Sequence, residues 1–73
     1  MAAARPIKTH YNGGRVARST RVKSAAKAAF RRLLDGDFNK AEIINDRNRM
    51  VATLSLVKGQ SVHLTIYSPR SFK

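Results

Sequence analysis

The residues best suited to acid–base chemistry in this sequence are His63, Tyr67 and Arg70. A histidine can transfer a proton near neutral pH, an arginine can hold a phosphate, and a tyrosine can position a substrate. On an extended strand the side chains of residues 63 and 67 lie on the same face. Together the three would suit cleavage of RNA. The alternative is a half-exposed strand histidine without a chemical role, and we favour that interpretation.

No other set of residues has the spacing of a catalytic, metal or cofactor motif. The chain has no cysteine and two histidines, His10 and His63, with no carboxylate at ligand spacing from either. No glycine-rich phosphate-binding motif is present. The four acidic residues lie between positions 35 and 46, where a helix end, a loop and a strand edge are simpler roles than a catalytic pair. We expect no cofactor and no metal, and we favour binding over catalysis.

The net charge is the feature that points most directly to a partner. Fifteen Lys and Arg residues against four acids give a formal net charge of +11. A surface this basic suits a polyanion, above all nucleic acid. A basic face kept only for solubility is the alternative, but it gives no reason to confine all four acids to residues 35–46.

One helix is predicted, over residues 19–35. Its apolar residues recur at steps of three and four and therefore share a face. Ser19 or Thr20 can cap its first turn. Lys23, Lys27 and Arg31 step by four along one flank, and the cations in its first turn oppose the helix dipole. That arrangement favours a bound anion, although long Lys and Arg stems can also cover apolar surface.

Residues 1–18 show no sustained periodicity and contain Pro6, two glycines and scattered cations. We predict a flexible basic arm that becomes ordered when it contacts nucleic acid. Tyr11 is a candidate for stacking on a base, and packing against the core is the favoured alternative. One or two of Ile7, Tyr11 and Val16 could also dock on the core as a short strand or anchor.

Three strands are predicted after the helix, at residues 41–45, 49–57 and 61–67, from alternating apolar and polar residues. The predicted fold class is α+β: a single α-β-β-β domain over residues 19–68, in which the helix packs on a three-stranded antiparallel meander. The flexible arm precedes this domain, and a short basic tail, residues 69–73, follows it. The predicted core comprises Val22, Ala26, Ala29, Phe30, Leu33, Phe38, Ile43, Met50, Ala52, Leu54, Leu56, Val62, Leu64 and Ile66.

The element order between Lys23 and Tyr67, a helix followed by a three-stranded meander, resembles that of the small messenger-cleaving toxins of bacterial toxin–antitoxin pairs. This resemblance concerns the order of elements. It implies RNA cleavage by the His63, Tyr67 and Arg70 side chains described above. The same outline occurs in unrelated binding domains, so the outline alone does not decide the function.

The favoured function is a small basic nucleic-acid-binding protein, directed mainly at phosphates, with weak sequence preference. It would act as an accessory or regulatory factor of a phage, plasmid or bacterial host, and DNA is slightly preferred over RNA. The first alternative is a module or inhibitor that attaches to an acidic protein partner, and the second is a small RNase of the toxin type. No apolar run approaches the roughly 18 residues that span a membrane, so we expect a cytoplasmic protein without a membrane partner. The predicted nucleic-acid-binding residues are Arg5, Lys8, Arg15, Arg18, Arg21, Lys23, Lys27, Arg31, Arg32, Arg47 and Arg49.

Overall fold

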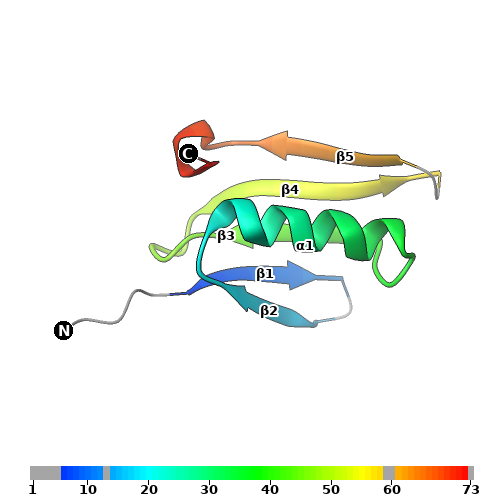
Figure 1. The fold of residues 1–73 in the computed structure, drawn as a ribbon, viewed down its shortest axis with the longest axis horizontal. Coiled ribbons are helices and arrows are strands. Elements are labelled where there is room, and N and C mark those ends of the chain that lie inside the picture. Colours follow the sequence, from blue (N-terminus) through cyan, green and yellow to red (C-terminus); the bar gives the residue numbers. More distant parts are fainter. Residues whose placement is uncertain (1–5, 13, 59–60, 73) are drawn as a thin grey trace.

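The chain forms a five-stranded antiparallel sheet with one helix lying across one of its faces (Figure 1). The computed structural model describes residues 6–12, 14–58 and 61–72. The strand order is β2-β1-β3-β4-β5, so β2 and β5 are the two edges. The elements are β1 (Ile7–Tyr11), β2 (Val16–Ser19), α1 (Val22–Leu34), β3 (Lys40–Ile44), β4 (Met50–Val57), β5 (Ser61–Ile66) and the 3-10 helix η1 (Pro69–Phe72).

The predicted α-β-β-β architecture is wrong, because the segment before the helix belongs to the sheet. Strands β1 and β2 form a hairpin, and β1 also pairs with β3, which places it inside the sheet. The flexible arm predicted at residues 1–18 is therefore incorrect for residues 6–12 and 14–18; residues 1–5 and 13 lie outside the described residues. Gly14 adopts a φ of +90° in the hairpin turn, a conformation that suits glycine.

Strand β1 has the alternation of a half-buried strand, but one inward position is polar. Ile7, Thr9 and Tyr11 are buried, whereas Lys8 and His10 are exposed. Thr9 is 1% exposed, and threonine suits strands because it is β-branched. In the sequence, the polar Thr9 stands between Lys8 and His10, so the alternation of apolar and polar residues is not visible. This strand therefore resembles a polar arm.

A side chain ties the first hairpin to the rest of the sheet. The Asn12 Oδ1 atom accepts hydrogen bonds from the backbone N–H groups of Asn39, at 2.8 Å, and Lys40, at 3.1 Å. These bonds join the end of β1 to the start of β3. Beside them, the ring of Tyr11 stacks on that of Phe38 with a centroid distance of 4.5 Å. The hairpin is thus anchored by both packing and hydrogen bonds.

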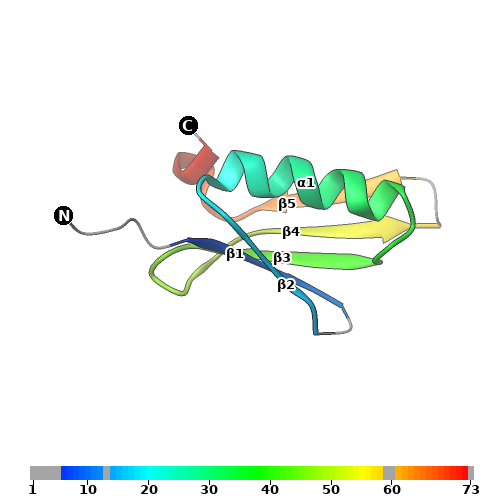
Figure 2. The same ribbon diagram turned by 60° about the horizontal axis from the view of Figure 1, so that its bottom comes forward.

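The helix contacts the sheet through small residues. Val22, Ala25, Ala29 and Leu33 are its buried residues, so α1 presents two alanines to the strands. Figure 2 shows α1 as a separate layer on one side of the sheet. The rest of the core comes from the strands, namely Ile7, Tyr11, Ala41, Ile43, Val51, Ala52 and Leu54. Among the described residues, no helix is long and apolar enough to cross a membrane.

The buried face of α1 is rotated relative to the predicted one. The prediction centred on Ala26, Ala29 and Phe30, whereas the observed face includes Ala25 and leaves Phe30 45% exposed. At about 100° per residue, the difference is a rotation of roughly 45° toward the β1–β2 hairpin. The unforeseen hairpin explains this rotation, because it supplies apolar partners such as Tyr11 on that side.

Three further predicted core residues are also exposed. Leu64 and Ile66 on β5 are 42% and 43% exposed, and Met50 at the start of β4 is also exposed. The segment predicted as a basic tail, residues 69–73, includes η1, and Phe72 in η1 packs against the core. The described part of the C-terminal segment therefore contributes to packing, while Lys73 lies outside the described residues.

Candidate nucleic-acid interface

Three cations on α1 form a row along its solvent-exposed side. Lys23, Lys27 and Arg31 are all exposed, and residues four apart along a helix lie about 6 Å apart along its axis. We call these three residues the helix stripe. The exposed Ser24 and Ala28 lie on one side of it, and the exposed Phe30 and Leu34 lie on the other.

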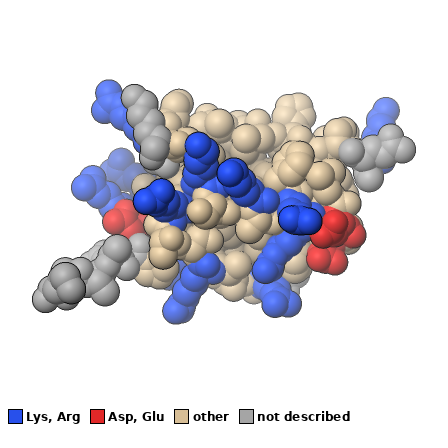
Figure 3. All heavy atoms as spheres, viewed as in Figure 1, with Lys and Arg blue, Asp and Glu red and all other residues tan. Residues whose placement is uncertain are grey.

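No ion pair neutralises the helix stripe in the described part of the chain. None of its three cations forms an ion pair within 4.0 Å among the described residues. Figure 3 shows Lys and Arg side chains gathered over the helix side of the molecule, with acidic groups only toward its two ends. The stripe is therefore available to an external anion.

The start of α1 differs from the prediction. The N-cap position is Arg21, which makes no side-chain capping hydrogen bond, so neither Ser19 nor Thr20 caps the helix. The first turn contains no acidic residue, and Lys23 adds a second cation to it. Positive charge accumulates here from the helix dipole and from two side chains. This end of the stripe is consequently the most electropositive part of α1.

Arg32 and Tyr11 lie together in the packed part of the protein. The guanidinium of Arg32 lies 5.4 Å from the centroid of the Tyr11 ring, and Tyr11 is only 3% exposed. Burial raises the pKa of the Tyr11 hydroxyl above its ordinary value, and the Arg32 charge offsets part of that rise. Tyr11 is therefore enclosed rather than presented to a base, and packing, the alternative role considered for it, is the one observed.

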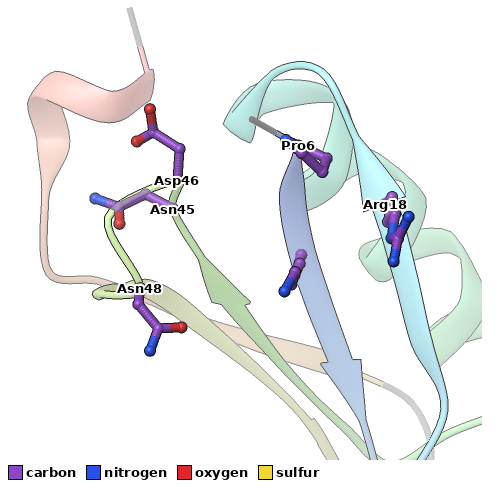
Figure 4. A pocket seen from close by; sticks show the side chains of 6 residues that line it. Pro6, Arg18, Asn45, Asp46 and Asn48 are labelled. Atoms are coloured by element: carbon purple, nitrogen blue, oxygen red, sulfur yellow. The ribbon is translucent and has the colours of Figure 1, made fainter. Parts of the chain in front are cut away.

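Lys8 and Arg18 lie on the opposite face of the sheet from α1. They occupy paired positions on β1 and β2, and both alternate with residues that face the helix. They line a hollow of about 550 Å³ together with Pro6 and residues of the β3–β4 turn. Figure 4 shows the turn residues across this hollow from Pro6 and Arg18. One of those turn residues is Asp46, so the hollow contains an acid as well as two cations.

The β3–β4 turn is organised by a residue that sequence analysis did not single out. The Asn45 Oδ1 atom accepts hydrogen bonds from the backbone N–H groups of Arg47 and Arg49, both at 2.9 Å. An asparagine that opens a turn in this way is a recognisable signal. The turn holds two exposed arginines at the end of the sheet where the hollow lies.

The predicted binding residues therefore divide between two faces of the molecule. Arg21 and the helix stripe lie on the helix side, whereas Lys8 and Arg18 lie on the opposite face of the sheet. Arg15 is exposed in the β1–β2 turn, and Arg5 lies outside the described residues. A single straight duplex cannot contact both faces at once, so the number of phosphates contacted is smaller than the full set of predicted residues implies.

The residues considered for RNA cleavage do not converge. His63 lies on β5 opposite Ser55, and Tyr67 follows the end of this strand. Four residues along a strand span about 13 Å, which is too far for both side chains to act on one reacting phosphate. The toxin-like order of elements is also interrupted, because the β1–β2 hairpin joins the same sheet.

Neither a metal site nor a known relative gives a further indication of function. The described residues contain no group of three or more His, Cys, Asp or Glu side chains that could hold a metal ion. No protein-family model, curated protein or solved structure matches the chain. The functional conclusion therefore depends on the geometry and charge of this molecule alone.

Proposed function

We propose that this protein binds the sugar–phosphate backbone of duplex nucleic acid, with DNA preferred over RNA, through the helix stripe. The observation that carries the proposal is the row of Lys23, Lys27 and Arg31, which is exposed and forms no ion pair among the described residues. Phosphate contacts of this kind supply most of the affinity of non-specific nucleic-acid binding. Arg21 extends the row at the start of α1.

The shape of the helix side supports duplex DNA as the preferred form. Helix α1 stands above the sheet as a separate layer (Figure 2), and Ser24 and Ala28 on its outer surface are small. The major groove of B-form DNA admits a helix, whereas that of an RNA duplex is deep and narrow. A projecting helix with cations along its flank can thus approach the groove edges of DNA.

The aromatic residues support a duplex over a single strand. Proteins that bind single strands usually stack bases on exposed aromatic side chains. Here Tyr11 is buried, and Phe38 and Phe72 are half-buried. In the described part of the chain, Phe30 on α1 and Tyr67 after β5 are the exposed aromatic residues, at 45% and 59%. Two rings on separate elements do not form a continuous stacking platform.

Weak sequence preference follows from the composition of α1. Its sequence, VKSAAKAAFRRLL, contains neither asparagine nor glutamine, the side chains that pair in bidentate fashion with adenine. The stripe includes one arginine that could read guanine, Arg31, and two lysines. Such a row positions a backbone but distinguishes few bases.

Salt dependence tests this proposal. Three or four phosphate contacts predict that log K falls with log salt with a slope of about −2.7 to −3.6 for a B-form duplex. Between 50 and 200 mM salt, the affinity should fall roughly 40- to 150-fold by the same relation. Fluorescence anisotropy with one labelled sequence as duplex DNA, single-stranded DNA and duplex RNA provides the measurement. A flat salt response, or tighter binding to the single strand, would contradict the proposal.

A further inference from the structure

A groove on the helix side of the sheet remains uncovered. It has a volume of about 330 Å³ and lies between α1 and the edge strand β5, where it is lined by Ala26, Lys27, Phe30, Leu54 and Leu64. Figure 1 shows α1 crossing the middle of the sheet, with β5 at one edge. Five strands span about 19 Å between the outer two, whereas a helix is about 10 Å across. One helix therefore cannot cover the whole face.

The groove has the composition of a binding surface. Phe30 and Leu64 line it while remaining 45% and 42% exposed, and Ile66, on the same face of β5, is 43% exposed. Adjacent large apolar residues that stay exposed usually mark a site for a partner. The groove lies on the face of the sheet, between side chains, where a second helix can pack beside α1, whereas an added strand would pair at the edge.

The charges around the groove are asymmetric and indicate the partner's chemistry. On the α1 side, Lys27 lines the groove, and Lys23 lies one turn away on the same flank. On the other side, strand β5, SVHLTI, contains no Lys, Arg, Asp or Glu. A helix that fills the groove would thus meet cations along one edge and a neutral strand along the other.

This asymmetry argues against a second copy of the chain as the occupant. Among the described residues, α1 is the only α-helix, and it contains four cations and no acid. A second α1 in the groove would bring like charges together, and each copy carries a net charge of +11. Juxtaposed like charges disfavour such a pairing.

We propose that this groove binds an amphipathic helix of a partner protein, with an acidic flank that faces Lys23 and Lys27. Apolar residues of the partner at positions i, i+3 or i+4, and i+7 would contact Phe30 and Leu64. Acidic residues four apart on its flank would match the spacing of the two lysines. Helix α1 has 13 residues, so a partner helix of about 14 residues, roughly 20 Å long, would match it in length.

A designed peptide provides the probe. It has 14 residues, with leucines at i, i+3, i+7 and i+10 and glutamates on one flank. Its control is an isomer of identical composition in which the leucines are spread around the helix, so the charge is unchanged. Binding is measured by fluorescence anisotropy, and the site is located by amide chemical-shift changes. We expect the designed peptide to bind at least tenfold more tightly than its isomer, with shifts concentrated at Ala26, Phe30 and Leu64.

Matched variants locate the site independently. Phe30→Ala and Leu64→Gln alter half-exposed side chains, so the fold should persist, and each should remove most of the tenfold preference. Val16→Gln is the control, because Val16 is equally exposed, at 46%, but lies on the opposite edge strand. It should leave the preference intact. Equal binding of the two peptides, or equal losses in all three variants, would overturn the proposal. Sedimentation that shows a dimer dissociated by Leu64→Gln would also overturn it, because a second copy would then fill the groove.

The inference shares Lys23 and Lys27 with the proposed nucleic-acid function, but it is tested through Phe30 and Leu64, which that function does not use. Phe30→Ala and Leu64→Gln do not change any charge, so DNA affinity and its salt slope should stay as in the unmodified protein. If no form of the protein binds DNA but the peptide preference persists and depends on Leu64, the proposed function fails and this inference holds. If DNA binding is intact and the peptide preference is absent, this inference fails and the proposed function holds.

Discussion

Replacing Tyr11 with alanine tests whether the first hairpin is part of the folded core. The ring is 3% exposed, stacks on Phe38 at 4.5 Å and lies 5.4 Å from the guanidinium of Arg32. Removal of a large buried aromatic side chain typically costs about 3–5 kcal/mol. A domain of 73 residues has a total stability of about 4–11 kcal/mol. Tyr11→Ala should therefore remove a large part of the free energy of unfolding.

Chemical denaturation followed by circular dichroism measures this effect, with Tyr11→Phe as the control that keeps the ring. If Tyr11→Ala does not fold, Tyr11→Leu keeps most of the apolar bulk. It loses the aromatic and cation–π contacts, about 1–2.5 kcal/mol together. A flexible arm would give a different result, because neither change would then alter stability. A loss below about 1 kcal/mol for Tyr11→Ala would refute the packed hairpin.

Two further predictions concern the same region. Burial raises the pKa of the Tyr11 hydroxyl. The protonated hydroxyl therefore contributes fully to the free energy of unfolding below about pH 10, where tyrosine titrates in the unfolded chain. This contribution is lost as the pH rises through the folded pKa. Denaturation between pH 8 and 11.5 should show this alkaline loss in the unmodified protein but not in Tyr11→Phe, and equal pH profiles would contradict it. Asn12→Ala removes the acceptor for the N–H groups of Asn39 and Lys40 and should cost about 1–2 kcal/mol. Asn12→Asp, which keeps an acceptor oxygen, should lower the free energy of unfolding by less in the same experiment. If Asn12→Ala leaves the free energy of unfolding unchanged, water replaces the lost hydrogen bonds and the prediction is wrong.

The sequence contains clear signals for α1 and for the three strands that follow it, because each has a sustained period. The first hairpin lacks such a signal. Its inward residues include Thr9, the outward residues of β1 are a lysine and a histidine, and a glycine-containing turn separates two short strands. These are also the properties of a disordered basic segment. The pairing of β1 with β3 joins residues 30 to 36 positions apart, and no local pattern indicates such a contact.

The exposed groove could not be predicted for a related reason. Periodicity identifies which residues of α1 share a face, but the orientation of that face depends on what the sheet offers. With three strands, Phe30 and Leu64 would meet in the core; with five, α1 turns toward Tyr11 and leaves them exposed. The cations of α1 required no tertiary information, since their spacing alone places them together on one flank.

Two triple variants with equal charge changes test the central claim, that the helix stripe is the nucleic-acid interface. The first replaces Lys23, Lys27 and Arg31 with glutamine, which has a similar helix propensity and removes repulsion of about 0.2–0.5 kcal/mol per pair. The second replaces Lys8, Arg18 and Arg47 with glutamine, outside the helix side. The measurement is the affinity for duplex DNA as a function of salt. We predict that the stripe variant loses about 2.7 from the magnitude of the salt slope, while the second variant keeps a slope close to that of the unmodified protein. Loss of binding in the second variant, with binding retained in the stripe variant, would contradict the account.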